Sequence, residues 1–344
     1  MRTIIKAFAI NGFISLIIAY IAFLVFGSIL YAVILFSIIL FLGLVKSTLT
    51  ILNILVQRTR WYKRKVGDGI KFRKEIDTNL DICNLGSNSG KYAFSYEETG
   101  LKGENWALGP QTLSYDFRIL KNYSSYLKEG ATVLISLCPF SSCIRDFEND
   151  TINHKYYSFL HPIFILNYSK STSKQVMRFV NEPFLVSPVK SLIRLFKDVS
   201  VDNVIEMNKD EIEINANEFI TIWKDQFSIS NLDAPVSKEN MESVTYNTNL
   251  LLEMISFCFE RKLKPVIVIP PVSKALHSKF SETFCENYIY SFIHRANNKQ
   301  IPFLNYFDEQ QFAENNLYFN SYFLNENGRK LFTKKVLKDL QLID

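Results

Sequence analysis

The pattern of apolar and polar residues changes sharply near the start of the chain. From Ala7 to Val45 no residue is charged, and Ile, Leu, Phe, Val and Ala dominate. As one helix this run would extend about 58 Å, roughly twice the thickness of a bilayer core. Gly27-Ser28 lies near its middle, so we expect spans at about 8–26 and 29–45. A secretory signal peptide would have a shorter apolar region and a small-residue cleavage site. The pattern therefore predicts one or two transmembrane helices, with the lipid bilayer as a partner.

A basic segment follows the apolar run. Residues 47–65 are amphipathic, and Trp61 and Tyr62 lie among the Lys and Arg residues, as is typical of a membrane interface. We therefore assign residues 1–65 to a membrane anchor. Residues 66–344 then form one domain, with an irregular, aromatic-rich insertion at about 141–240 that contains helical pieces near 156–168 and 189–196.

Short apolar runs alternate with helical patterns in the predicted domain. Strands are expected at about 79–85, 131–137, 264–269 and 302–307, and helices at about 111–127, 237–262, 280–297 and 325–340. This alternation predicts an α/β fold with a doubly wound, mainly parallel sheet, a flavodoxin-like three-layer sandwich. In such folds ligands bind outside the carboxyl ends of the strands.

The net charge of +5 is unevenly distributed. Residues 1–65 contain eight Lys or Arg and no Asp or Glu, whereas residues 66–344 contain 31 basic and 34 acidic residues. No basic stripe remains in the domain, so we expect no nucleic-acid partner. Basic flanks on both sides of the apolar run favour a cytoplasmic domain.

Motifs for a metal or a nucleotide cofactor are missing from the sequence. The five cysteines form no C-x-x-C pair, and an odd number of scattered thiols argues against a disulfide framework. There is no Walker-type loop, no H-E-x-x-H motif and no EF-hand spacing. We therefore expect neither a metal nor a cofactor.

Two polar motifs stand at opposite ends of the predicted domain. Residues 83–96 read CNLGSNSGKYAFSY and place a tight turn after the first strand, and residues 319–328 read FNSYFLNENG before the last helix. A hydroxyl becomes a nucleophile when a base and oxyanion donors lie beside it. Ser87 and Ser89 are therefore the candidate nucleophiles. Ser, Asn and Gly are also the residues that a tight turn favours on conformational grounds.

In these motifs and in its order of elements the chain resembles the SGNH (GDSL-type) hydrolase superfamily. The resemblance covers about residues 79–140 and 263–340. It implies a nucleophile in the first turn, Gly and Asn oxyanion donors, and a terminal Asp-x-x-His that supplies the base. Gly86-Ser87-Asn88 matches Gly-Asp-Ser, which places Asn88 in the nucleophile position, and a shift of one residue places Ser87 there.

The other blocks match less completely. Asn105 and Gly109 match the second block loosely and would hold the oxyanion, whereas Pro139-Phe140-Ser141 lacks the Asn of the third. In the last block Asn320 stands in the Asp position and Phe323 in the His position. A Phe cannot accept a proton, and Asn320 can only orient or hydrogen-bond. The four histidines, His154, His161, His277 and His294, are the remaining candidate bases.

The sequence therefore leaves two functions side by side. In the first, the domain is a pseudoenzyme of SGNH type that binds a cell-envelope or capsular glycan, or an envelope-assembly partner. In the alternative, it is an active serine esterase or O-acyltransferase that acts on an acylated surface glycan through Ser87 or Ser89. The resemblance implies the inner membrane of a bacterium, where membrane-tethered relatives usually face outward, against the charge bias. Either way, we expect residues 86–90 to meet residues 320–323 at the carboxyl edge of the sheet, with no histidine in reach of either serine.

Overall fold

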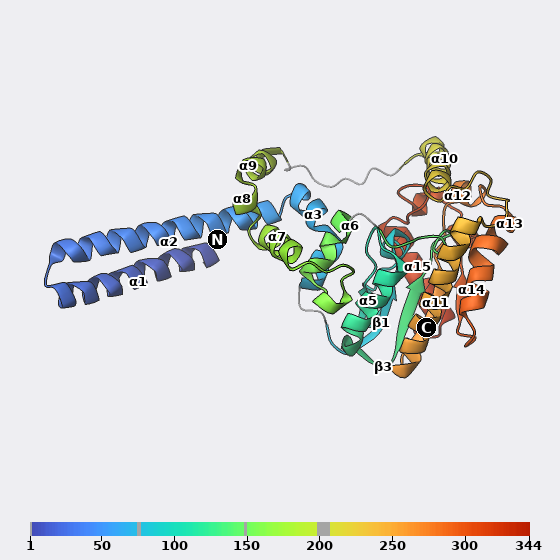
Figure 1. Ribbon diagram of the computed structural model, residues 1–344, viewed down its shortest axis with the longest axis horizontal. Helices are drawn as coiled ribbons and strands as arrows, with labels where there is room; N and C mark the ends of the chain where they lie inside the picture. The colour runs from blue at the N-terminus through green and yellow to red at the C-terminus, as the bar shows by residue number, and fades with distance from the viewer. Residues whose placement is uncertain (1, 74–76, 148–149, 198–206) are drawn as a thin grey trace. The chain divides into compact units, whose positions relative to one another are not determined.

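The computed structural model describes residues 2–73, 77–147, 150–197 and 207–344, which belong to two compact units (Figure 1). The first unit comprises Met1–Ile70 and Ser169–Val201, and the second comprises Lys71–Tyr168 and Asp202–Asp344. The first unit contains residues 1–65, which the sequence assigned to the anchor, and it continues to Ile70. The expected insertion, however, is divided, because residues 169–201 belong to the unit that contains the apolar helices.

Two long apolar helices form much of the first unit. Helices α1 (Arg2–Phe26) and α2 (Ile29–Gln57) lie side by side and are separated at Gly27-Ser28 (Figure 1). Gly27 has φ +60°, which a residue without a Cβ adopts readily. The break is therefore where the sequence predicted it. Helix α2 is long and apolar enough to cross a membrane, which suggests a membrane anchor, and α1 contains a shorter apolar stretch over Gly12–Val25.

The described residues of the first unit also form the shorter α-helices α3 (Arg60–Val66), α7 (Lys170–Asn181), α8 (Pro183–Val186) and α9 (Pro188–Lys197). Tyr62 of α3 packs against Phe179 of α7 with ring centroids 5.8 Å apart, and its hydroxyl donates to the Val180 carbonyl at 2.7 Å. Only 1% of Tyr62 is exposed. The prediction that Tyr62 faces a membrane interface is therefore wrong, because its ring belongs to the core of this unit.

The second unit contains a five-stranded, all-parallel sheet. Its strands are β1 (Leu80–Leu85), β2 (Gly103–Asn105), β3 (Leu127–Ser136), β4 (Lys264–Ile269) and β5 (Phe303–Asn305), in the order β2-β1-β3-β4-β5. This order is that of flavodoxin-like doubly wound folds, in which the switch point lies between β1 and β3. The α/β class and the parallel sheet are thus confirmed, and β2 is a strand that the sequence pattern missed.

Helices cover both faces of the sheet (Figure 1). On one face α5 (Leu113–Tyr123), α11 (Lys238–Glu260) and α14 (Ser291–Ala296) pack together. On the other face α15 (Glu326–Asp339) buries Phe332 and Val336 against Leu134 and Val266 of the central strands. The remaining described α-helices of the unit are α4 (Asn88–Lys91), α6 (Asp150–Asn153), α10 (Lys209–Gln226), α12 (Lys274–His277) and α13 (Glu282–Phe284).

Candidate functional site

The turn after β1 lies at the switch point of the sheet. Gly86 has φ +131°, a conformation that side chains disfavour. Its amide donates to the Asp116 carboxylate at 2.7 Å, and its carbonyl accepts from the Leu108 amide at 3.1 Å. A Cβ on Gly86 would come within 2.7 Å of the Ser136 carbonyl at the end of β3, and one on Gly90 within 2.7 Å of the Leu85 carbonyl. The turn is therefore closely packed against the two strands beside the switch point.

The three residues in the nucleophile region have different surroundings. The Ser87 hydroxyl accepts a hydrogen bond from the Gln111 amide at 3.0 Å. The Asn88 side chain lies against Gly109, where an added Cβ would meet its Oδ1 at 1.6 Å. Ser89 is buried, and its Oγ makes no well-formed hydrogen bond within the described residues. Only Ser87 and Asn88 are partly exposed.

A buried hydrogen-bond network holds the backbone of the turn at Gly86. Gln111 donates to the Asp116 carboxylate at 2.5 Å and to the Gly86 carbonyl at 3.2 Å, and it accepts from the Tyr156 hydroxyl at 3.2 Å. Burial raises the pKa of Asp116 to about 7, although the hydrogen bonds from Gln111 and Gly86 and the charge of Lys155 act in the opposite direction. The carboxyl group of Asp116 thus titrates near neutrality while it holds the turn.

The two residues expected to hold an oxyanion have structural partners. The Asn105 side-chain amide donates to the carbonyls of Gly90, Lys91 and Phe94 at 3.0–3.3 Å, and its oxygen accepts from Asn84. Both amide hydrogens of Asn105 are therefore engaged in holding α4 and the residues after it. Gly109 provides the space that the Asn88 side chain occupies, which explains why a residue without a side chain stands there.

The C-terminal motif reaches this turn, as the sequence predicts. Phe323 packs against Tyr92, just beyond the turn, with ring centroids 4.9 Å apart. Tyr322 faces Ser89 and Cys138. Burial and the neighbouring Cys138 thiol raise the pKa of Tyr322 well above its usual value, and the Ser89 hydroxyl lowers it to a smaller extent. Tyr322 therefore stays protonated at neutral pH and cannot act as a base toward Ser89.

Asn320 has a local role in the same motif. Its side-chain oxygen accepts hydrogen bonds from the amides of Tyr322 and Phe323 at 2.9 and 2.8 Å. The side chain thus shapes its own turn, as Asn often does. Neither the orienting position nor the base position contains a group that can remove a proton.

The four histidines interact with groups other than Ser87 and Ser89. His161 accepts from the Ile163 amide at the start of a helical turn, and His277 lies 3.3 Å from the Asp308 carboxylate. His154 makes an edge-on ring contact with Tyr157, and His294 is an exposed residue of α14. Among the described residues no histidine hydrogen-bonds to either candidate serine.

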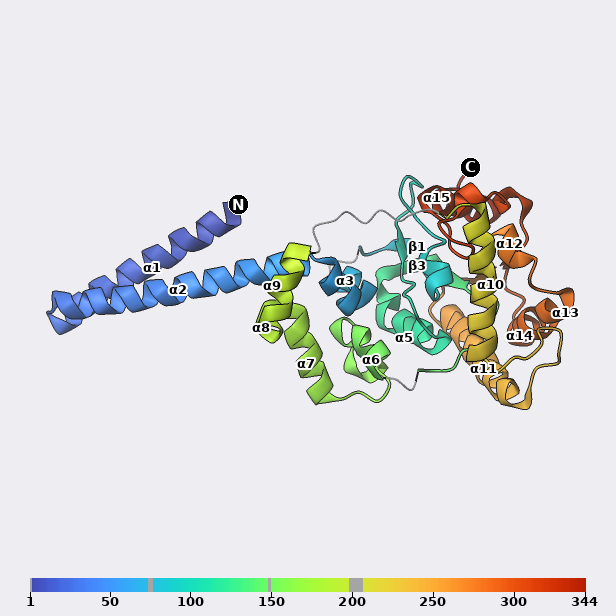
Figure 2. The same ribbon diagram turned by 90° about the horizontal axis from the view of Figure 1, so that it is seen from above.

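Helix α10 lies beside α12 (Figure 2), and its aromatic rings contact the C-terminal motif. Its Phe219 and Trp223 contact Tyr322 with ring centroids 5.4 and 5.1 Å apart, and Trp223 also contacts Phe140 after β3. Asn215 of α10 accepts from the amide and hydroxyl of Ser321 at 3.1 and 2.8 Å. Sequence reasoning missed this helix, although Ile212, Ala216, Phe219 and Trp223 follow a helical repeat that would have indicated it.

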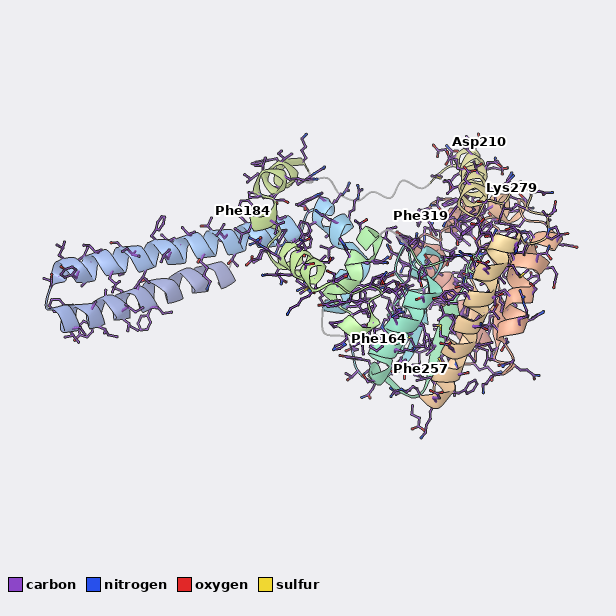
Figure 3. All side chains as sticks on the ribbon, viewed as in Figure 1. Phe164, Phe184, Asp210, Phe257, Lys279 and Phe319 are labelled. Carbon is purple, nitrogen blue, oxygen red and sulfur yellow. The ribbon has the colours of Figure 1, made fainter. Side chains whose placement is uncertain are left out.

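A cluster of aromatic rings remains partly exposed beside the covered turn: Tyr92, Phe319 and Phe323, with centroids 4.9–5.7 Å apart. Phe319 is labelled in Figure 3. We call these three residues the aromatic platform.

Across residues 2–73, 77–147, 150–197 and 207–344 no group of three His, Cys, Asp or Glu is placed to hold a metal ion. Comparison with models of known protein families and with curated protein sequences finds no match for this chain.

Proposed function

We propose that this chain is a membrane-anchored, SGNH-hydrolase-like protein that binds a cell-envelope or capsular glycan, or helps to assemble it, without Ser-His-Asp chemistry. The main support is the absence of a basic group at the position where the resemblance expects one. The residue in the expected position of the base is Phe323, and its ring packs on Tyr92 next to the turn that contains Ser87 and Ser89. A serine hydroxyl without a neighbouring base is a weak nucleophile.

The aromatic platform supports a glycan as the ligand. A sugar ring has apolar C–H faces, which pack well on large, rigid aromatic surfaces. Phe319 and Phe323 come from the C-terminal motif and Tyr92 from the first motif, so the platform combines residues of both motifs. Binding there would use the geometry of a hydrolase site without its reaction.

The membrane anchor supports a role at the envelope. We assign the protein to the inner membrane of a bacterium. Basic residues on both sides of the apolar helices favour a cytoplasmic position for the α/β domain. A glycan intermediate or an assembly partner at that face of the membrane fits this orientation.

A binding measurement on the full chain tests the proposal. The detergent-solubilised protein is applied to an array of purified bacterial surface polysaccharides, and the best ligand is titrated against variants. Phe319→Ala should weaken binding about tenfold, which corresponds to about 1.4 kcal/mol. The control Phe259→Ala removes an exposed Phe, on α11 near the amino end of β4, and should leave binding unchanged. Equal loss in both variants, or no polysaccharide bound, contradicts the proposal.

A further inference from the structure

Helix α9 presents an apolar stripe to the surface of the first unit. Four residues of this stripe follow the i, i+3, i+4, i+7 spacing of one helix face: Val189, Leu192, Ile193 and Phe196. All four are exposed, Val189 by 72% and Phe196 by 83%. The face of α9 that packs inward is a different one, because Ser191 is fully buried and donates to the Pro183 carbonyl at 3.3 Å. The apolar stripe therefore does not serve the packing of the unit.

Basic residues border this stripe. Lys190, Arg194 and Lys197 lie on the adjoining face of α9, and the helix has no acidic residue. Residues 1–70 and 169–201, the first unit, contain fourteen Lys or Arg and three Asp or Glu in sequence. An apolar stripe edged with cations is the pattern of helices that lie in a membrane interface. Near an anionic leaflet each basic residue contributes about 1 kcal/mol of attraction.

The attachment of α8 and α9 to α2 places them at a defined depth. Asn53 of α2 accepts from the Phe184 amide at 2.9 Å, and Gln57 donates to the Val180 carbonyl at 3.2 Å. Phe184 is labelled in Figure 3. Counted from Ser28, a bilayer core of about 30 Å takes up about 20 residues of helix, to roughly residue 48. Asn53 lies about 7 Å further along, which is the thickness of one headgroup layer.

We propose that α8 and α9 lie in the headgroup layer of an anionic lipid leaflet, with the apolar stripe at the acyl boundary and the basic residues among the phosphates. The first unit then holds its membrane by a helical hairpin and by a surface helix together. This inference rests on the membrane anchor of the proposed function, but it is independent of the chemistry of the α/β domain.

The test uses the full chain in lipid vesicles. Phe196→Cys carries an environment-sensitive fluorophore, and the control Gln175→Cys carries it at an exposed polar position of α7 in the same unit. The unmodified chain, treated in the same way, corrects for label on the five native thiols, of which four are buried. Quenching by brominated acyl chains and by aqueous iodide is measured in phosphatidylglycerol vesicles and in phosphatidylcholine vesicles.

In phosphatidylglycerol vesicles we expect the label at 196 to be quenched by brominated lipid and to be several-fold less accessible to iodide than the label at 175. In phosphatidylcholine vesicles, or in the variant Arg194→Glu/Lys197→Glu, the label at 196 should be quenched more by iodide and less by brominated lipid. Equal iodide quenching at both positions overturns the inference. Shielding of the label at 196 from both iodide and brominated lipid would indicate that this position contacts protein, which would also overturn the inference. If the label at 196 is equally buried in phosphatidylglycerol and phosphatidylcholine vesicles, the basic residues do not contribute to membrane contact. A chain that fails to float with vesicles contradicts the anchor itself, whereas the glycan measurement does not depend on this outcome.

Discussion

The ring of Phe323 packs against the ring of Tyr92, with centroids 4.9 Å apart, although the two residues belong to motifs at opposite ends of the α/β domain. Tyr92 follows the turn after β1, and Phe323 stands in the position where the resemblance places a catalytic histidine. The two motifs are therefore in contact, and the contact at this position is an apolar packing of two rings.

The Asp116 carboxyl should make the α/β domain less stable at high pH. Burial raises its pKa from 3.8 to about 7. Between about pH 4 and pH 7 the folded state therefore binds more protons than the unfolded state, so stability falls as pH rises and becomes constant above about pH 8. A shift of this size corresponds to about 4 kcal/mol at most. Thermal unfolding of the wild type and of Asp116→Asn, followed from pH 4 to pH 8.5, measures this loss of stability with rising pH.

The Asp116→Asn variant serves as the control because it cannot ionise. The two proteins should have similar stability at pH 4, where Asp116 is mostly protonated, and the wild type should lose stability relative to the variant as pH rises. Parallel pH profiles for the two proteins would mean that the carboxyl is not desolvated in the folded state.

The contact between Gly109 and Asn88 should appear as a coupling energy. A Cβ at position 109 would lie 1.6 Å from Asn88 Oδ1, so Gly109→Ala must displace this side chain. We expect it to cost about 1–3 kcal/mol in the wild type, as overpacking does. In the Asn88→Ala background most of that cost should disappear. Denaturant unfolding of the four proteins gives the coupling energy, and additive effects would refute the contact.

The Tyr62 hydroxyl should stabilise the docking of α7 in the first unit. Tyr62→Phe keeps the ring packing on Phe179 but removes the 2.7 Å hydrogen bond to the Val180 carbonyl, which remains buried. Gln57 still donates to this carbonyl at 3.2 Å, so the cost is that of one net hydrogen bond, about 0.5–1.5 kcal/mol. Amide hydrogen exchange in residues 170–181 should become about 2–13-fold faster. Tyr246→Phe, which removes an exposed hydrogen bond to Asp146, should leave this exchange unchanged.

Much of the fold follows from local sequence patterns. The strand at 80–85 leads into the Gly-Ser-Asn-Ser-Gly turn, and the apolar run of the strand at 264–269 stops at Pro270-Pro271. Helix α11 begins after Ser237, whose side chain caps it. These signals are local, and the sequence predicted them within a few residues. The break at Gly27-Ser28 was equally clear.

The parts that the sequence did not predict depend on contacts between distant residues. Strand β2 has three residues and is defined by its pairing with β1. Asp116 is an ordinary helix-start carboxylate by sequence, and only its burial beside Gly86 makes it a support of the turn. The association of residues 169–201 with α2 likewise depends on tertiary contacts, such as that of Asn53 with Phe184.

The reactivity of the hydroxyls in the turn tests the central claim most directly. The wild type and the variant Asn88→Ser/Asn320→Asp/Phe323→His are incubated with a fluorophosphonate probe, and labelled peptides are identified by mass spectrometry. Because no base lies beside Ser87 or Ser89 among the residues that the structure describes, we expect no labelling there. The variant restores the three expected residue types and should be labelled at position 88, unlike a control that retains Asn88. Stoichiometric labelling of wild-type Ser87 or Ser89 would contradict the account, because it would show an active serine enzyme.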